Sequence, residues 1–242
     1  MTKIIGHRGV PSLAPENTLS SFKLAIKLKL DFFEFDVRET KDGEIVSIHL
    51  NDIKKMTGME GKISEMNYED LKYLTFNYPE KFGKKFKGEK LPRLQDVLNL
   101  AKRKIKIVIE LKADNIEEKV LLFLKKKRMV KESAIISSNL DSLKILRKNS
   151  KFIELIYLSN LLDEKIIDSI SKLKVNHIAI GRGGIITKEM VEYGKKMNVN
   201  LWKFTIDNKT DMRRLIKENA YGIISNYPQK FLEIINPAPN NA

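Results

Sequence analysis

The sequence predicts an α/β fold, a closed (β/α)8 TIM barrel with a small insertion after the second strand. Two observations support this prediction. Apolar extended runs alternate with amphipathic runs along the chain, and from Ile105 onward the alternation is strict, with short connections. Such alternation is typical of a parallel sheet covered by helices. The chain has 242 residues, the size at which eight strand–helix units close into a barrel.

The first part of the chain supplies two of the eight strands. KIIG at 3–6 resembles a short buried strand, and FFEFDV at 32–37 alternates aromatic and acidic side chains, as a strand does. Between them, Leu19, Phe22 and Ala25 fall on one helical face. The elements expected here are a strand at 3–6, a helix at 17–28, a strand at 32–37, an extended run at 45–50 and a helix at 94–103.

The second part supplies the remaining six strands. They are expected at 105–112, 133–138, 152–158, 177–181, 200–206 and 222–225, with helices at 116–128, 140–148, 163–173, 187–197, 211–218 and 229–235. A doubly wound open sheet is the alternative, but the chain has no glycine-rich dinucleotide-binding turn.

One irregular segment, residues 45–92, interrupts the pattern between the second and third strands. We interpret it as an insertion within a single domain spanning residues 1–242. Its Lys-rich stretch at 80–90 is expected to be a loop, and the polar, Pro-rich tail at 236–242 is expected to fray.

Composition limits the setting in which the protein works. The formal net charge is +14, from 45 Lys+Arg against 31 Asp+Glu, which attracts anions or simply favours solubility. The chain has no cysteine, which excludes disulfides and thiolate metal sites. No apolar run approaches the ~20 residues of a membrane helix, and no signal peptide or base-stacking platform is present. We expect a cytoplasmic protein without stable membrane anchoring or a nucleic-acid partner; its oligomeric state stays open.

Candidate site residues follow the ends of the first strands, and barrel active sites lie at the carboxyl ends of the strands. His7 and Arg8 come directly after the first strand. Glu34 and Asp36 are two residues apart on the second strand, so both carboxylates point to one face. They suit Mg²⁺ or Ca²⁺, which prefer oxygen ligands. The alternative, exposed acids on an edge strand, conflicts with the flanking aromatic residues.

The third strand ends with the same alternation. Glu110 and Lys112 share a face, so a third carboxylate can complete a metal site while the lysine holds an anion; an internal ion pair is the alternative. His49 ends the extended run at 45–50. Two imidazoles offer a general base and a general acid, and Arg8 and Lys112 suit a phosphate. The set indicates metal-assisted cleavage of a phosphate ester.

These motifs resemble those of the glycerophosphodiester phosphodiesterase family over nearly the whole chain. The resemblance rests on GHRGVPSLAPENT (6–18), FFEFDVRETKDG (32–43), the histidine of VSIHL, LPRLQDVL (91–98), IVIELK (107–112) and the segment 204–228. It implies a (β/α)8 barrel that hydrolyses glycerophosphodiesters, small-molecule substrates, to glycerol phosphate and an alcohol with a divalent cation.

By position, the resemblance also assigns roles to residues. It implies metal ligands at Glu34, Asp36 and Glu110, an acid–base pair at His7 and His49, phosphate contacts at Arg8 and Lys112, and substrate contacts at Trp202 and Phe204. We expect Glu16 and Asn17 to be structural, with Asn17 or Thr18 capping the first helix.

Four positions depart from the family pattern. Leu50 replaces an Asp after the second histidine, Lys55 replaces an Arg, Phe204 replaces a Trp and Asn226 replaces an Asp. The Leu50 change removes a carboxylate that would orient the histidine. Two alternatives stay open: a lysophospholipid-type phosphodiesterase that forms a cyclic phosphate, and a barrel that binds phospho-ligands without catalysis. The sequence does not say which histidine is the acid or which metal binds.

Overall fold

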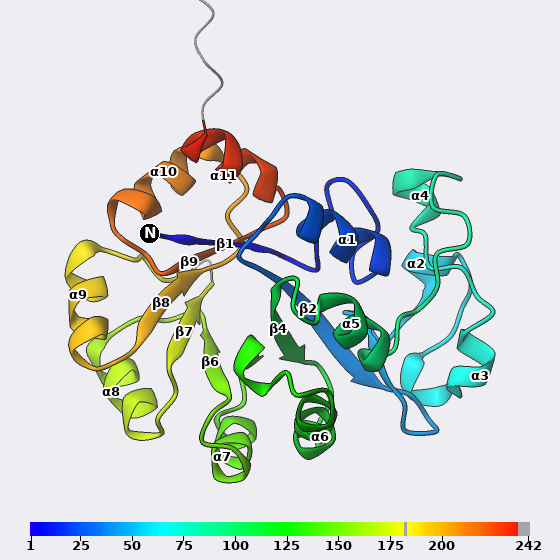
Figure 1. Ribbon diagram of the computed structural model, residues 1–242, viewed down its shortest axis with the longest axis horizontal. Helices are drawn as coiled ribbons and strands as arrows, with labels where there is room; N and C mark the ends of the chain where they lie inside the picture. The colour runs from blue at the N-terminus through cyan, green and yellow to red at the C-terminus, as the bar shows by residue number, and fades with distance from the viewer. Residues whose placement is uncertain (182, 237–242) are drawn as a thin grey trace, which may run out of the picture.

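The structure, a computed structural model, describes residues 1–181 and 183–236 and confirms the barrel (Figure 1). Strand β1 pairs in parallel with both β2 and β9, which closes the sheet. Within the described residues the barrel strands are β1 (Lys3–Gly6), β2 (Phe32–Glu39), β4 (Lys106–Leu111), β5 (Ser133–Ser137), β6 (Glu154–Ser159), β7 (His177–Ile180), β8 (Asn200–Lys203) and β9 (Gly222–Ser225).

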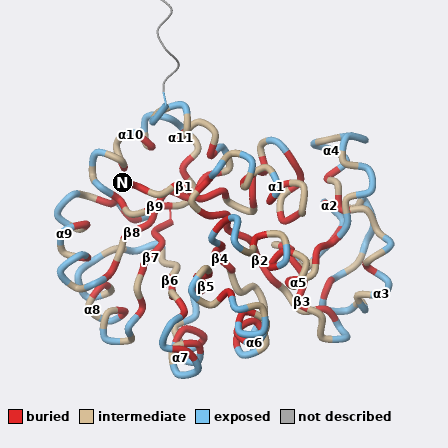
Figure 2. The backbone as a smooth tube through the Cα atoms, viewed as in Figure 1, coloured by how far each residue is buried: buried red, intermediate tan, exposed pale blue. Residues whose placement is uncertain are grey.

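Helices surround this barrel in chain order. They are α1 (Leu19–Lys27), α5 (Leu94–Ala101), α6 (Glu117–Lys127), α7 (Leu140–Asn149), α8 (Glu164–Lys172), α9 (Lys188–Lys196), α10 (Lys209–Lys217) and α11 (Pro228–Ile235). The main core lies between helices and strands, where side chains such as Phe22, Phe33 and Ile109 are completely buried. Figure 2 shows the same arrangement, with buried residues along the strands and exposed residues on the outer faces of the helices.

The segment after β2 forms a compact appendage beside the barrel (Figure 1). It contains β3 (Ile45–Ser47), antiparallel to β2, then α2 (Lys54–Thr57), a 3₁₀ turn (Ile63–Glu65), α3 (Tyr68–Leu71) and α4 (Pro79–Phe82). Its apolar side chains form a separate cluster that includes Ile53, Leu71 and Leu91. The Lys-rich stretch expected to be a loop begins inside α4, where Pro79 provides a first-turn residue that needs no N–H partner.

Side chains fill the interior of the barrel, and Trp202 is one of them. It is completely buried against Phe32, and its Nε1 donates a hydrogen bond of 3.0 Å to Nδ1 of His177. The predicted substrate contact at Trp202 is therefore wrong, because no surface of the side chain is left for a ligand. The expected strand at 200–206 ends at Lys203, and Phe204, partly buried, packs against the same interior cluster as Trp202.

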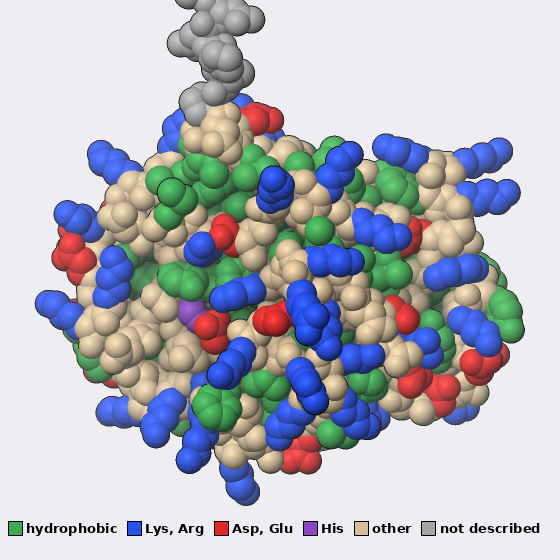
Figure 3. All heavy atoms as spheres, viewed as in Figure 1, with side chains coloured by type: hydrophobic (Ala, Val, Ile, Leu, Met, Phe, Trp, Pro, Cys, Tyr) green, Lys and Arg blue, Asp and Glu red, His purple; other side chains and the backbone are tan. Residues whose placement is uncertain are grey.

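Charged side chains are spread over the face of the molecule that Figure 3 shows, rather than gathered at one place. On the face seen in Figure 3, Lys and Arg side chains are scattered over the barrel and the appendage, with Asp and Glu between them. Among the described residues no helix is both long and apolar enough to cross a membrane. Of the tail expected to fray, residues 237–242 lie outside the described part of the chain.

Candidate active site

A cavity of about 200 Å³ opens at the carboxyl ends of the barrel strands. One wall is apolar and is formed by Ile136, Leu158 and Ile224. The opposite wall is charged. Seven of the residues singled out from the sequence line the cavity, namely His7, Arg8, Glu34, His49, Glu110, Lys112 and Phe204.

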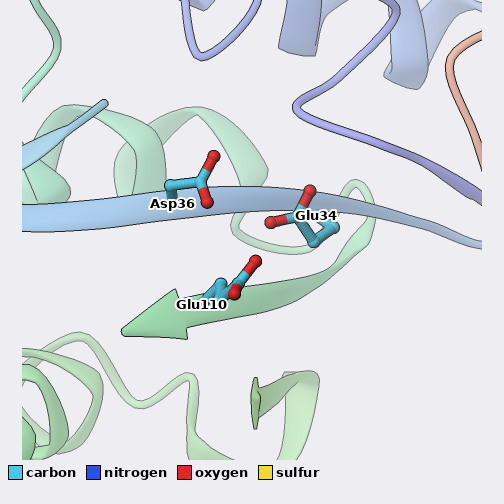
Figure 4. Close-up of side chains that lie close together, drawn as sticks. All are labelled: Glu34, Asp36 and Glu110. Carbon is cyan, nitrogen blue, oxygen red and sulfur yellow. The ribbon is translucent and has the colours of Figure 1, made fainter. Parts of the chain in front are cut away.

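Three carboxylates converge at the base of the charged wall (Figure 4). Asp36 on β2 is directly paired with Glu110 on β4, and Glu34 precedes Asp36 by two residues on the same strand face. The three groups offer oxygens that all lie within 4.8 Å of one another. Glu34 and Asp36 are buried, which excludes the interpretation as exposed acids on an edge strand.

The electrostatics of this cluster fit a hard divalent cation. Burial and the neighbouring charges of Asp36 and Glu110 raise the pKa of Glu34 well above its usual range. Burial and Asp36 also raise the pKa of Glu110. Oε1 of Glu34 is buried and has no hydrogen-bond partner among the described residues. Because each feature would be relieved by a bound cation and all donors are carboxylate oxygens, the cluster could hold a metal ion.

Asp36 is fixed by Asn17, whose backbone is left-handed with φ 59°. Nδ2 of Asn17 donates to Oδ2 of Asp36 over 2.9 Å, and the backbone N–H of Asp36 donates to Oδ1 of Asn17 over 3.1 Å. Thr18 caps α1 by accepting from the N–H of Ser21. Of the two candidates for the cap, Thr18 therefore takes that role, and Asn17 orients a candidate metal ligand.

Arg8 connects the carboxylates to the loop after β1. Its backbone has φ 51°, and its N–H donates to Oε2 of Glu34 over 2.9 Å. The guanidinium lies between two acids: Nε is 3.1 Å from Oδ2 of Asp36, and Nη1 is 2.8 Å from Oε1 of Glu16. Gly9 follows with φ 87°, and a Cβ there would lie 2.3 Å from Oγ of Ser21. This tight turn aims Arg8 at the cavity.

His7 is held by a chain of hydrogen bonds that defines its tautomer. Its Nδ1 lies 2.8 Å from Oδ1 of Asn226, and Nδ2 of Asn226 donates to Asp207 over 2.8 Å. Because Asp207 fixes the amide, the oxygen faces the ring and Nδ1 of His7 carries the proton. Nε2 is then an acceptor without a hydrogen bond from any described residue; it faces the cavity, 4.0 Å from Oε2 of Glu34. Burial and the adjacent Arg8 charge lower the pKa of His7.

His49 is oriented by a carboxylate instead. Its Nδ1 lies 3.0 Å from Oδ1 of Asp36. Although burial opposes it, this bond and the Arg8 charge lower the pKa of Asp36, which keeps the group ionised. Leu50 is 38% exposed. A carboxylate thus orients His49 although position 50 is Leu, and that carboxylate belongs to Asp36.

Arg38 on β2 links two site residues and was not found from the sequence. Its Nε donates to the backbone oxygen of His49 over 2.8 Å, and Nη1 donates to the backbone oxygen of Lys112 over 2.7 Å. Lys112 itself pairs with Glu110 and lies 3.7 Å from Oδ1 of Asp36. The ion pair expected as an alternative role of Lys112 is thus present, and the same ammonium group lines the cavity.

The fold and the site define the class of protein. It is a (β/α)8-barrel enzyme in which three carboxylates that could hold a metal ion lie beside two imidazoles and two cations. Sequence comparison then gives the family. The model of the glycerophosphoryl diester phosphodiesterase family matches residues 7–230, and the chain belongs to this family.

Individual relatives cover almost the whole chain. A glycerophosphodiester phosphodiesterase of Caldanaerobacter subterraneus is 34% identical over 97% of this chain and 98% of its own. One of Bacillus subtilis is 28% identical, with 95% and 85% covered. Among solved structures, a phosphodiesterase of Oleispira antarctica in complex with the product sn-glycerol-3-phosphate superposes with a TM-score of 0.86 at 23% identity, covering 97% of both chains. At that identity the likeness shows the fold.

Proposed function

We propose that the protein hydrolyses glycerophosphodiesters to glycerol phosphate and an alcohol, with Glu34, Asp36 and Glu110 holding Mg²⁺ or Ca²⁺. The observation that supports this best is the buried Glu34 oxygen without a partner, in a cluster of three carboxylates beside two cations. The names of the relatives agree with this chemistry, and the product bound in the Oleispira structure is a glycerol phosphate. The single domain and the cytoplasmic location stay predictions from the sequence.

The substrate phosphate is placed by this chain's own cations. Arg8 presents a planar guanidinium that is hydrogen-bonded to Glu16 and ion-paired with Asp36, and Lys112 adds a second positive charge on the same cavity. A divalent cation, when bound, supplies Lewis-acid stabilisation of charge on the phosphoryl oxygens. The glycerol half lies against the apolar wall that includes Ile136 and Leu158.

The two histidines take opposite roles because their partners differ. His49 is backed by the Asp36 carboxylate, which stabilises an imidazolium, and His7 is backed by the neutral Asn226 amide. His7 therefore accepts a proton at Nε2 from the attacking water or substrate hydroxyl. The bond from phosphorus to the alcohol oxygen breaks, and His49 gives its Nε2 proton to the departing alkoxide. After turnover His7 carries an extra proton and His49 lacks one. Proton exchange with solvent restores both rings.

Substituting each histidine tests the assignment. His7→Ala and His49→Ala are each expected to lower kcat on a glycerol diester by roughly 10²–10⁴-fold. With a p-nitrophenyl diester, whose leaving group needs little protonation, His49→Ala recovers much of its rate and His7→Ala does not. Equal recovery by both variants contradicts the assignment. Phosphorus NMR of the products shows whether water or a substrate hydroxyl attacks, because the second route forms a cyclic phosphate.

A further inference from the structure

A second cavity, of about 110 Å³, lies between the barrel mouth and the appendage. The loop after β1 contributes Pro11 and Glu16, and the appendage contributes Lys55 and Tyr78. The two cavities are connected by one contact: Arg8 lines the first cavity, Glu16 lines the second, and Nη1 of Arg8 lies 2.8 Å from Oε1 of Glu16. A diester whose phosphate contacts Arg8 thus has a second space within reach.

Tyr78 contributes to this cavity a hydroxyl group that lacks a hydrogen-bond partner among the described residues. The residue is 6% exposed, and the hydroxyl itself is buried. Buried polar groups are paired in most proteins, so a buried hydroxyl without a partner points to a ligand. Burial, the charge of Glu16 and a side-chain interaction with Glu16 raise the pKa of Tyr78. The hydroxyl therefore stays protonated as a donor, with the Glu16 carboxylate beside it. Its backbone is left-handed, with φ 50° and ψ 68°, a conformation that is unfavourable for a bulky side chain and often occurs at functional sites.

Lysine ammonium groups lie over the two aromatic rings of the cavity. A cationic alcohol such as choline would need those ring faces to be open. Nζ of Lys55 lies 5.9 Å from the centre of the Tyr78 ring, and Nζ of Lys81 lies 5.1 Å from the centre of the Phe82 ring. Lys81 is held there by a 2.6 Å hydrogen bond to the backbone oxygen of Pro11. Quaternary ammonium groups bind to aromatic faces. Because both faces already hold a cation, a choline group would meet repulsion.

We infer that this second cavity receives the departing alcohol of the diester and selects small uncharged polyols over cationic alcohols. The inference rests on the proposed function and names the substrate class of the same site. A polyol hydroxyl accepts the proton of Tyr78, and a second hydroxyl donates to Glu16. Choline offers neither contact.

Paired substrates test the inference with the full chain and Mg²⁺. The wild type is expected to show a higher kcat/KM for glycerophosphoglycerol than for glycerophosphocholine. Tyr78→Phe keeps the ring and deletes the hydroxyl, and it should lower the glycerol-to-choline ratio of kcat/KM by at least ~10-fold. Tyr73→Phe is the matched control, because Tyr73 is 74% exposed on the same appendage; its ratio should equal that of the wild type.

Lys55→Met should also lower the glycerol-to-choline ratio of kcat/KM, but by improving cleavage of the choline diester. Removing the cation from the Tyr78 ring should raise the relative rate on the choline diester. A Tyr78→Phe ratio within twofold of the wild type, or a wild type that prefers choline, overturns the inference while leaving the proposed function in place. A wild type that cleaves neither diester overturns the proposed function itself. Melting curves of each variant confirm that a changed ratio comes from a folded protein.

Discussion

The side-chain oxygen of Asn226 lies 2.8 Å from Nδ1 of His7, at the end of a chain that begins at Asp207. The two residues come from opposite ends of the sequence and meet because β1 and β9 are neighbours in the barrel. A neutral amide at this position fixes the tautomer of the imidazole without adding charge. His7 thus keeps Nε2 as an acceptor that faces the cavity.

Asn226→Ala tests this arrangement. The variant removes the acceptor for Nδ1–H, so the ring can rotate and adopt the other tautomer. We expect kcat to fall by about 10- to 100-fold, a loss typical for partners that orient a functional histidine, while metal affinity is retained. Steady-state kinetics and a metal titration measure both quantities. An unchanged kcat would show that Asn226 does not position His7.

Metal binding should stabilise the fold measurably. At a metal concentration 100 times Kd, binding adds about 2.7 kcal/mol to the free energy of unfolding, and Tm should rise by ~5–10 °C for a chain of this size. Differential scanning calorimetry with EDTA, Mg²⁺ or Ca²⁺ gives the values. Glu110→Gln removes one carboxylate and should abolish most of the rise. If EDTA leaves both activity and Tm unchanged, the three carboxylates have another role.

The pH dependence of this gain follows from the raised pKa of Glu34 and Glu110. Without metal, these groups hold protons in the folded state at a pH where the unfolded chain, with pKa ~4.3, has lost them. Their contribution to stability is complete below that value and is lost as the pH rises through the folded pKa. The difference in Tm between the metal-loaded and metal-free protein should therefore widen from acid toward neutral pH. A constant difference across that range would contradict the raised pKa values.

Arg38→Met is expected to destabilise the backbone that positions His49 and Lys112. The variant deletes the two hydrogen bonds that hold the backbone oxygens of His49 and Lys112. Hydrogen bonds that involve a charged group contribute roughly 1.5–3 kcal/mol each, so the free energy of unfolding should fall by about 2 kcal/mol or more. Urea denaturation measures that loss. Lys131→Met, on the 3₁₀ turn before β5, is a charge-matched control expected to have little effect.

The barrel could be predicted because each of its strands leaves a local pattern in the sequence. Buried parallel strands are short apolar runs, and the expected bounds at 3–6 and 222–225 match β1 and β9. The helices of the appendage, such as α2 and α3, were not predicted. Each has four residues, which is too short for a helical period to show.

The candidate site divides in the same way. Alternation along one strand placed Glu34 and Asp36 on a common face, and β2 has them there. Asn17 was expected to be structural, but its bonds to Asp36 were not predicted. Asp207 and Tyr78 were not predicted at all, because their roles arise only where distant loops meet. The predicted contact at Trp202 fails because the side chain is completely buried in the interior of the barrel, in the apolar cluster against which Phe204 packs.

The direct pairing of Asp36 with Glu110 has a consequence for how such a protein can diversify. Two adjacent strands fix the spacing of all three acids through the backbone ladder, whereas the second cavity is built largely by an appendage with a core of its own. Exchanging residues between α2 and α4 for those of another protein would leave the acids and the main core untouched. The chain is thus modular: new alcohol preferences can evolve, or be engineered, without rebuilding the chemistry.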